Sequence, residues 1–211
     1  MTAALAGVPA GVQANGLWIG RRQLFVRFAA EAETATMYTP EALASELKRL
    51  LKRSTYHSVS ISGRDPLGGA AFLQAAFEKF RPSIPVMLDV DGQRPEAVER
   101  VAGFVALVQV TLEDTPTEPM IEQAVATLTA AASAHVTHAL VLAPEESTTD
   151  GQILRVISQA HAAVPEVSIV LHPPVDSLTR NRRWLTFMEE ATALHGDLRV
   201  LGRLPRPTAA Y

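Results

Sequence analysis

Polar side chains with acid–base chemistry stand at the ends of three short apolar runs of the sequence. Asp89 and Asp91 end one run, Glu113 follows a second, and His172 follows a third. Carboxylates and imidazoles serve as general acids and bases and bind divalent metals. If the runs are parallel strands, these side chains gather at the carboxyl edge of a sheet. They then support metal-assisted or acid–base chemistry, or they cap helices and orient loops.

The apolar runs have the lengths and composition of strands. They are apolar at consecutive positions rather than alternating, which is typical of strands covered on both faces. The expected strands are 24–28, 58–62, 86–90, 106–111, 139–142, 168–171 and 198–201.

Amphipathic segments separate the strands and predict helices. The first begins at Thr39-Pro40, where a capping hydroxyl precedes a first-turn proline. Asp150 and Asn181 are expected N-caps farther on. Later helices are expected over 69–80, 95–102, 118–134, 151–163 and 181–195. Because crossovers between parallel strands are right-handed, six such units curl in one sense. We therefore expect an α/β fold with mostly parallel strands, a partial (βα)6 TIM-like barrel left open because eight units would close it.

Composition indicates a single domain over 1–211, within the ordinary range of globular chains. Of the 211 residues, 47% are hydrophobic and 19% charged. The segment 1–16, interrupted by Gly7, Pro9 and Gly11, is expected to be flexible or loosely packed. A net charge of -3 gives no basis for binding nucleic acid. No window approaches the ~18 apolar residues of a membrane span, and no secretion signal is visible, so we expect a cytoplasmic protein without a membrane partner.

Several strand ends resemble, in order, those of one enzyme family. The segment Ser62-Gly63-Arg64-Asp65-Pro66 is similar to a Gly-Gly-Glu-Pro segment that holds the methionine amino group of S-adenosylmethionine. The Asp89 to Gly92 segment resembles Glu-Thr-Asn-Gly, and Leu171-His172-Pro173 resembles Leu-Gln-Pro. The chain thus resembles the radical S-adenosylmethionine superfamily, especially 7-carboxy-7-deazaguanine synthases and small radical-activating enzymes, over roughly residues 16–201.

The resemblance places Glu31, Ala35 and Tyr38 where the family has the three cysteines of its CxxxCxxC loop. The chain contains no cysteine, and iron–sulfur clusters are held by thiolates. We therefore expect no iron–sulfur cluster, no other cofactor and no radical chemistry. Arg64 replaces a glycine where backbone would approach the cofactor closely, which argues against retained binding of S-adenosylmethionine.

Two functions remain open at this point. The first is a non-catalytic pseudoenzyme that binds a partner protein or a small ligand in the barrel crevice; the resemblance also implies a homodimer. The alternative is a non-radical enzyme on the same scaffold, acting on a small polar molecule and binding S-adenosylmethionine or a purine. Its catalytic residues would be Asp89, Asp91, Glu113 and His172.

Overall fold

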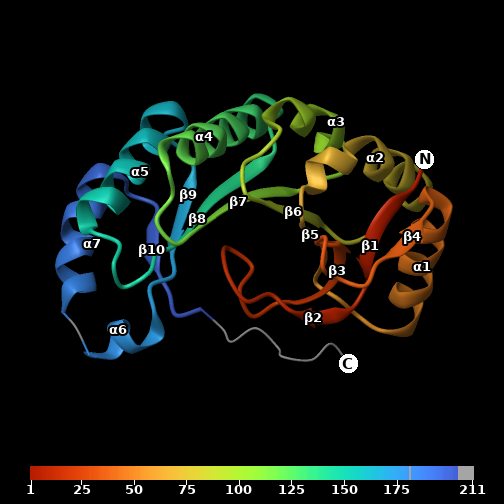
Figure 1. The fold of residues 1–211 in the computed structure, drawn as a ribbon, viewed down its shortest axis with the longest axis horizontal. Coiled ribbons are helices and arrows are strands. Elements are labelled where there is room, and N and C mark those ends of the chain that lie inside the picture. The colour runs from red at the N-terminus through yellow and green to blue at the C-terminus, as the bar shows by residue number, and fades with distance from the viewer. Residues whose placement is uncertain (181, 204–211) are drawn as a thin grey trace.

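The predicted parallel strands form one sheet, with helices arranged in an arc along its outer side (Figure 1). The computed structural model describes residues 1–180 and 182–203. All seven predicted strands are confirmed, and neighbours along the chain pair in parallel. They are β3 (Arg22–Phe28), β5 (Ser58–Gly63), β6 (Val86–Val90), β7 (Leu107–Glu113), β8 (Thr137–Ala143), β9 (Ser168–Leu171) and β10 (Leu198–Val200).

The N-terminal segment differs from the expectation of a loosely packed chain, because it adds antiparallel strands to the sheet. β1 (Ala3–Gly7) pairs with β3 and with β4 (Thr36–Tyr38), and β2 (Ala10–Val12) pairs with β3. Leu5 of β1 is fully buried. Gly7 and Gly11 lie within these strands, and Pro9 lies at the break between β1 and β2. The pattern of breaks alone does not separate such short, irregular strands from flexible chain.

The sheet is open. Its strands run in the order β10-β9-β8-β7-β6-β5-β3-β1-β4, so its edges are β10 and β4, and no pairing joins these two edges within the described residues. The fold is therefore α/β with mostly parallel strands in one curved, unclosed sheet.

The helices follow the predicted spacing, with a short helix that the sequence did not predict, α6, and a correction at one cap. They are α1 (Pro40–Arg53), α2 (Ala70–Phe80), α3 (Val98–Ala102), α4 (Glu118–Ser133), α5 (Asp150–Ala163), α6 (Val175–Arg180) and α7 (Arg183–Leu194), with 3-10 turns η1 (Pro66–Gly69) and η2 (Pro95–Ala97). Thr39 caps α1 as predicted. Thr149 rather than Asp150 caps α5, because the threonine and Gln152 form a reciprocal capping box. Asn181 lies outside the described residues.

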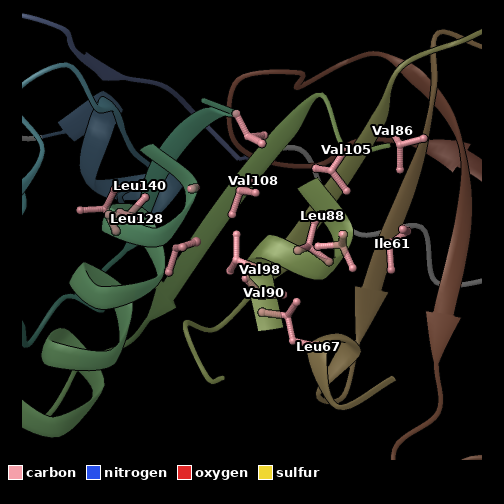
Figure 2. Packing of buried hydrophobic residues seen from close by; sticks show 14 of the residues in the cluster. Ile61, Leu67, Val86, Leu88, Val90, Val98, Val105, Val108, Leu128 and Leu140 are labelled. Carbon is pink, nitrogen blue, oxygen red and sulfur yellow. The ribbon is translucent and has the colours of Figure 1, made fainter. Parts of the chain in front are cut away.

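The hydrophobic core fills the space between the helices and the outer face of the sheet. Figure 2 shows residues of three neighbouring strands, Ile61, Leu88 and Val108, on the side of the sheet that carries α3 and α4. Val98 of α3 and Leu128 of α4 belong to the same buried cluster. These five side chains are fully buried. Because side chains alternate along a strand, the intervening residues face the opposite, inner side of the sheet. Within the described part of the chain, no helix is both long and apolar enough to cross a membrane.

Replacing Leu5 with alanine tests whether the N-terminal segment belongs to the folded core. Leu5→Ala should lower the free energy of unfolding by about 2–5 kcal/mol, since it leaves a cavity beside β3 and β4. The matched variant Val12→Ala, at an exposed position of β2, should change it by no more than about 0.5 kcal/mol. Urea denaturation measures both. Equal small effects would show that β1 is not packed as described.

Candidate functional site

The inner face of the sheet, turned away from the helices, carries the polar residues of the candidate site. It includes Asp89 of β6, Gln109 and Thr111 of β7, and His172 directly after β9. Gln109 and His172 are buried, with 0% and 3% of their surface exposed. Polar groups removed from water in this way need hydrogen-bond partners. The rest of the chain must supply them.

The loop of residues 13–21, between β2 and β3, covers this inner face. In Figure 1 it projects inside the arc of strands. Its Leu17 and Trp18 pack against a small apolar group on the inner face, formed by Met87, Leu107 and Ala139. We call residues 13–21 the inner loop. The chain thus fills with its own residues the space that sequence reasoning left open as a crevice.

Gly16 brings the inner loop into contact with the opposite wall of the sheet. Its backbone N–H donates a hydrogen bond to Nε2 of His172, over 2.8 Å and across 156 positions of sequence. Gly16 has a φ of +72°, and a Cβ built there would overlap the side-chain amide of Gln109. Both the backbone conformation and the space therefore require glycine.

His172 is held in one tautomer by two hydrogen bonds. Its Nε2 accepts from Gly16, so its Nδ1 carries the proton and donates to the carbonyl oxygen of Leu201 at 2.9 Å. Burial lowers the pKa of His172; the bond to Leu201 opposes this effect, and the nearby charge of Arg203 adds to it. The imidazole is therefore kept neutral, with both ring nitrogens engaged within the chain.

Asp89 is likewise bonded inside the chain. Its Oδ1 accepts a hydrogen bond of 2.7 Å from the Thr111 hydroxyl. Burial raises the pKa of the Asp89 carboxyl, and hydrogen bonds from Thr111, Gln109 and Gln13 oppose that rise, as does the charge of Arg203. Because Gln13 belongs to the inner loop, both Asp89 and His172 are contacted by the same covering segment.

The inner loop is also bonded within itself and to β7. The Gln13 side-chain amide donates to Oδ1 of Asn15 at 2.8 Å, and the Gln109 amide donates to the same oxygen at 3.4 Å. Gln13 and Asn15 are 3% and 6% exposed. Sequence reasoning gave no role to these amides or to Gly16. The sequence did hold one indication of this loop: Gln13 and Asn15 stand next to Gly16 and Trp18, just before a predicted strand.

Asp91 and Glu113 lie apart from Asp89 and His172 in their bonding. Asp91 is exposed and accepts hydrogen bonds from the backbone and side chain of Gln93, which closes a turn. Glu113 forms an ion pair of 2.7 Å with Arg203. Among the residues that the structure describes, no three histidines or acids come together as a metal site. Asp91 is therefore bonded in a turn of its own, whereas Arg203, the partner of Glu113, also lies near Asp89 and His172.

The segment from Ser62 to Pro66 covers the end of β5 and the turn that leads into η1. Gly63 has a φ of +102°, and a Cβ there would overlap the carbonyl oxygen of Phe28. Asp65 also adopts a left-handed conformation and caps η1 by accepting from the Gly68 N–H. Its two carboxylate oxygens accept from Nε of Arg94, each at 2.8 Å. The Asp65 carboxylate is therefore already bonded to Arg94, in the loop that follows β6.

The residues at the expected cluster positions do not fit an iron–sulfur cluster. Glu31 forms an ion pair of 2.9 Å with Arg64, next to β5. Tyr38 lies in β4, which pairs with β1 on the other side of β3, and its ring packs against the core. Ala35 has no side-chain donor atom. Carboxylate and phenol are poor ligands for sulfide-bridged iron, and here they are drawn to opposite sides of a strand.

Comparison with known proteins gives a partial sequence match. No family model matches the chain. It is similar to 7-carboxy-7-deazaguanine synthase from Methanothermobacter thermautotrophicus, with 31% identity over 115 residues. The match covers 48% of this chain and 46% of the synthase, so it spans about half the length of that relative.

A solved structure aligned to this chain is 3-keto-D-glucoside 4-epimerase from E. coli, in its apo form. The alignment covers 86% of this chain and 92% of the epimerase, at 11% identity and a TM-score of 0.32. At that TM-score the two chains are too different for a comparison of their sites.

Placing a methyl group on Gly16 tests the packing of the inner loop. Gly16→Ala should destabilise the protein by about 1–3 kcal/mol more than Gly20→Ala, because the added group overlaps Gln109. Gly20 is the matched control: its φ is +79°, and a Cβ there meets nothing within 4 Å. Both variants therefore carry similar backbone strain. Urea denaturation gives the two values, and equal losses would contradict the described contact.

The raised pKa of Asp89 predicts how stability depends on pH. The folded state holds the proton more tightly than the unfolded state, so this residue's contribution falls as the pH rises from the ordinary value of 3.8 through the folded-state pKa. Asp89→Asn cannot ionise and should gain stability relative to the native protein over that range. Unfolding by urea at a series of pH values measures the difference. A difference that does not change with pH, or one matched by Asp91→Asn, would refute the assignment.

Proposed function

We propose that this chain is a radical-S-adenosylmethionine-like protein without an iron–sulfur cluster, acting as a non-catalytic pseudoenzyme that binds a partner protein or a small ligand. Under this proposal the curved sheet is the partial (βα)6 barrel of that superfamily. The partial similarity to a 7-carboxy-7-deazaguanine synthase supports this descent.

One observation carries the proposal: the three positions expected to bind the cluster hold no thiolate. Glu31 is paired with Arg64, Ala35 offers no ligand atom, and Tyr38 packs on the core from β4. A four-iron cluster needs thiolate ligands. Without it the chain has no route to reductive cleavage of S-adenosylmethionine by the family's chemistry.

The contacts of the inner loop favour a non-catalytic binding protein over a non-radical enzyme. Asp89 and His172 face the inner side of the sheet, and the chain's own groups already bond to them. Glu113, which alternation along β7 places on the same side, is paired with Arg203. A general acid or base must reach the proton that it transfers. The alternative enzyme therefore requires these internal bonds to be exchanged for substrate.

Anaerobic reconstitution with iron and sulfide tests the proposal directly. The protein should bind no stoichiometric iron–sulfur cluster, show none of its visible absorption, and form no 5′-deoxyadenosine from S-adenosylmethionine with a strong reductant. The synthase from M. thermautotrophicus, treated in parallel, is the positive control. Stoichiometric cluster or cofactor cleavage by this chain would overturn the proposal.

Restoring all three cysteines tests whether the missing thiolates alone, or also the positions of these residues, prevent a cluster from forming. The variant E31C/A35C/Y38C should also fail to assemble a four-iron cluster, because position 38 is held in β4 by its pairing with β1, away from the turn that carries position 31. Iron and sulfide analysis after the same reconstitution gives the result. A cluster in this variant alone would show that lost cysteines, rather than the arrangement of the loop, account for the difference from the family.

A further inference from the structure

We propose that the hydrogen bond between Gly16 and His172 is an acid-released latch, which holds the inner loop in the sheet at neutral pH and frees it when the imidazole is protonated. The inference rests on the proposed function, since a chain that binds a ligand at its inner face must first uncover that face.

The bonding of His172 determines where an added proton goes. Nδ1–H already donates to the Leu201 carbonyl, so protonation places a hydrogen on Nε2, the atom that accepts from the Gly16 N–H. Two donors then face each other at a separation suited to a hydrogen bond. The contact changes from attractive to repulsive through a single protonation.

The positive charge of Arg203 disfavours the protonated form of His172 while the latch is closed. Arg203 lies close enough to affect both His172 and Asp89, and its own partner is Glu113. A second positive charge on the imidazole would face that guanidinium. Loss of the latch relieves both the repulsion with Arg203 and the burial of a charge.

Besides the latch, three kinds of contact hold the inner loop to the sheet in the described residues. Gln13 bonds to Asp89, the Gln109 to Asn15 bond is long at 3.4 Å, and the packing of Leu17 and Trp18 involves partly buried side chains. Local opening of segments held by few contacts needs much less free energy than global unfolding. Release would uncover Asp89 and Gln109, which are otherwise covered by the loop.

The test uses Trp18 as a reporter of the loop. The chain has two tryptophans, so Trp184→Phe leaves Trp18 as the single one. On lowering the pH from about 7.5 to about 5, acrylamide quenching of Trp18 should increase about twofold or more, with a midpoint below the ordinary imidazole value of 6.5. Far-UV circular dichroism should remain unchanged, which distinguishes loop release from unfolding.

The matched variant is His172→Gln in the same background. Glutamine supplies an acceptor and a donor without titrating, so the pH-dependent increase should disappear. His57, whose ring lies edge-on to Trp18 at 5.0 Å, is retained in both proteins and controls for local quenching by an imidazole.

Limited trypsin digestion gives a second readout that needs no change at Trp184. Cleavage after Arg21, the last residue of the inner loop, should accelerate at low pH in the native protein but not in His172→Gln, after correction for the protease's own pH dependence. The same acid transition in His172→Gln, by either readout, would overturn the latch. Neither measurement involves iron, so the latch and the absence of a cluster fail or succeed separately.

Discussion

The need to pair buried polar groups on the inner face of the sheet governs the rest of this structure. The outer face is satisfied by apolar packing against helices, whereas the inner face presents a carboxyl, a carboxamide and an imidazole away from water. An unpaired group of this kind costs about 1–3 kcal/mol. The inner loop supplies part of this pairing. Gly16 approaches closely enough to donate to His172, and Asn15 accepts from the Gln109 amide, whereas the Gln109 side-chain oxygen has no partner among the described residues.

This arrangement determines the chemistry that the sheet can offer. At the inner face, the acid and the imidazole are shifted toward their neutral forms and bonded to the chain. At the carboxyl edge, the charged residues pair between neighbouring loops: Glu31 with Arg64, and Asp65 with Arg94. Such exposed pairs contribute little to stability. The inner face is therefore covered by the chain itself at neutral pH, while the rim consists of charges that pair between neighbouring loops.

The sequence predicted the parallel part of this fold well, because its signals are local. Apolar runs mark each parallel strand, and the hydroxyl of Thr39 before Pro40 marks the start of α1. Strands β1, β2 and β4 escaped prediction because they are short and acquire their stability from pairing: β1 and β2 with β3, and β4 with β1. At α5, Asp150 and Thr149 are both good caps, and the reciprocal bond with Gln152 selects the threonine.

The candidate site was predictable only in part. The ends of the apolar runs could place Asp89 near the end of β6 and His172 after β9. They could not show which groups bond to these two side chains. The inner loop is remote in sequence from both, and its contacts depend on the curvature of the whole sheet. Pattern reasoning works within a segment, whereas this site joins residues near positions 16 and 172.

That long-range contact also has a consequence for synthesis of the chain on the ribosome. Residues 13–21 emerge early, but their docking surface is incomplete until β9 and the carbonyl of Leu201 have followed. Contacts between such distant positions slow folding, because a long loop must be closed before they form. The apolar side chains of this early segment therefore remain without their final partners through most of translation, when chaperones act on nascent chains.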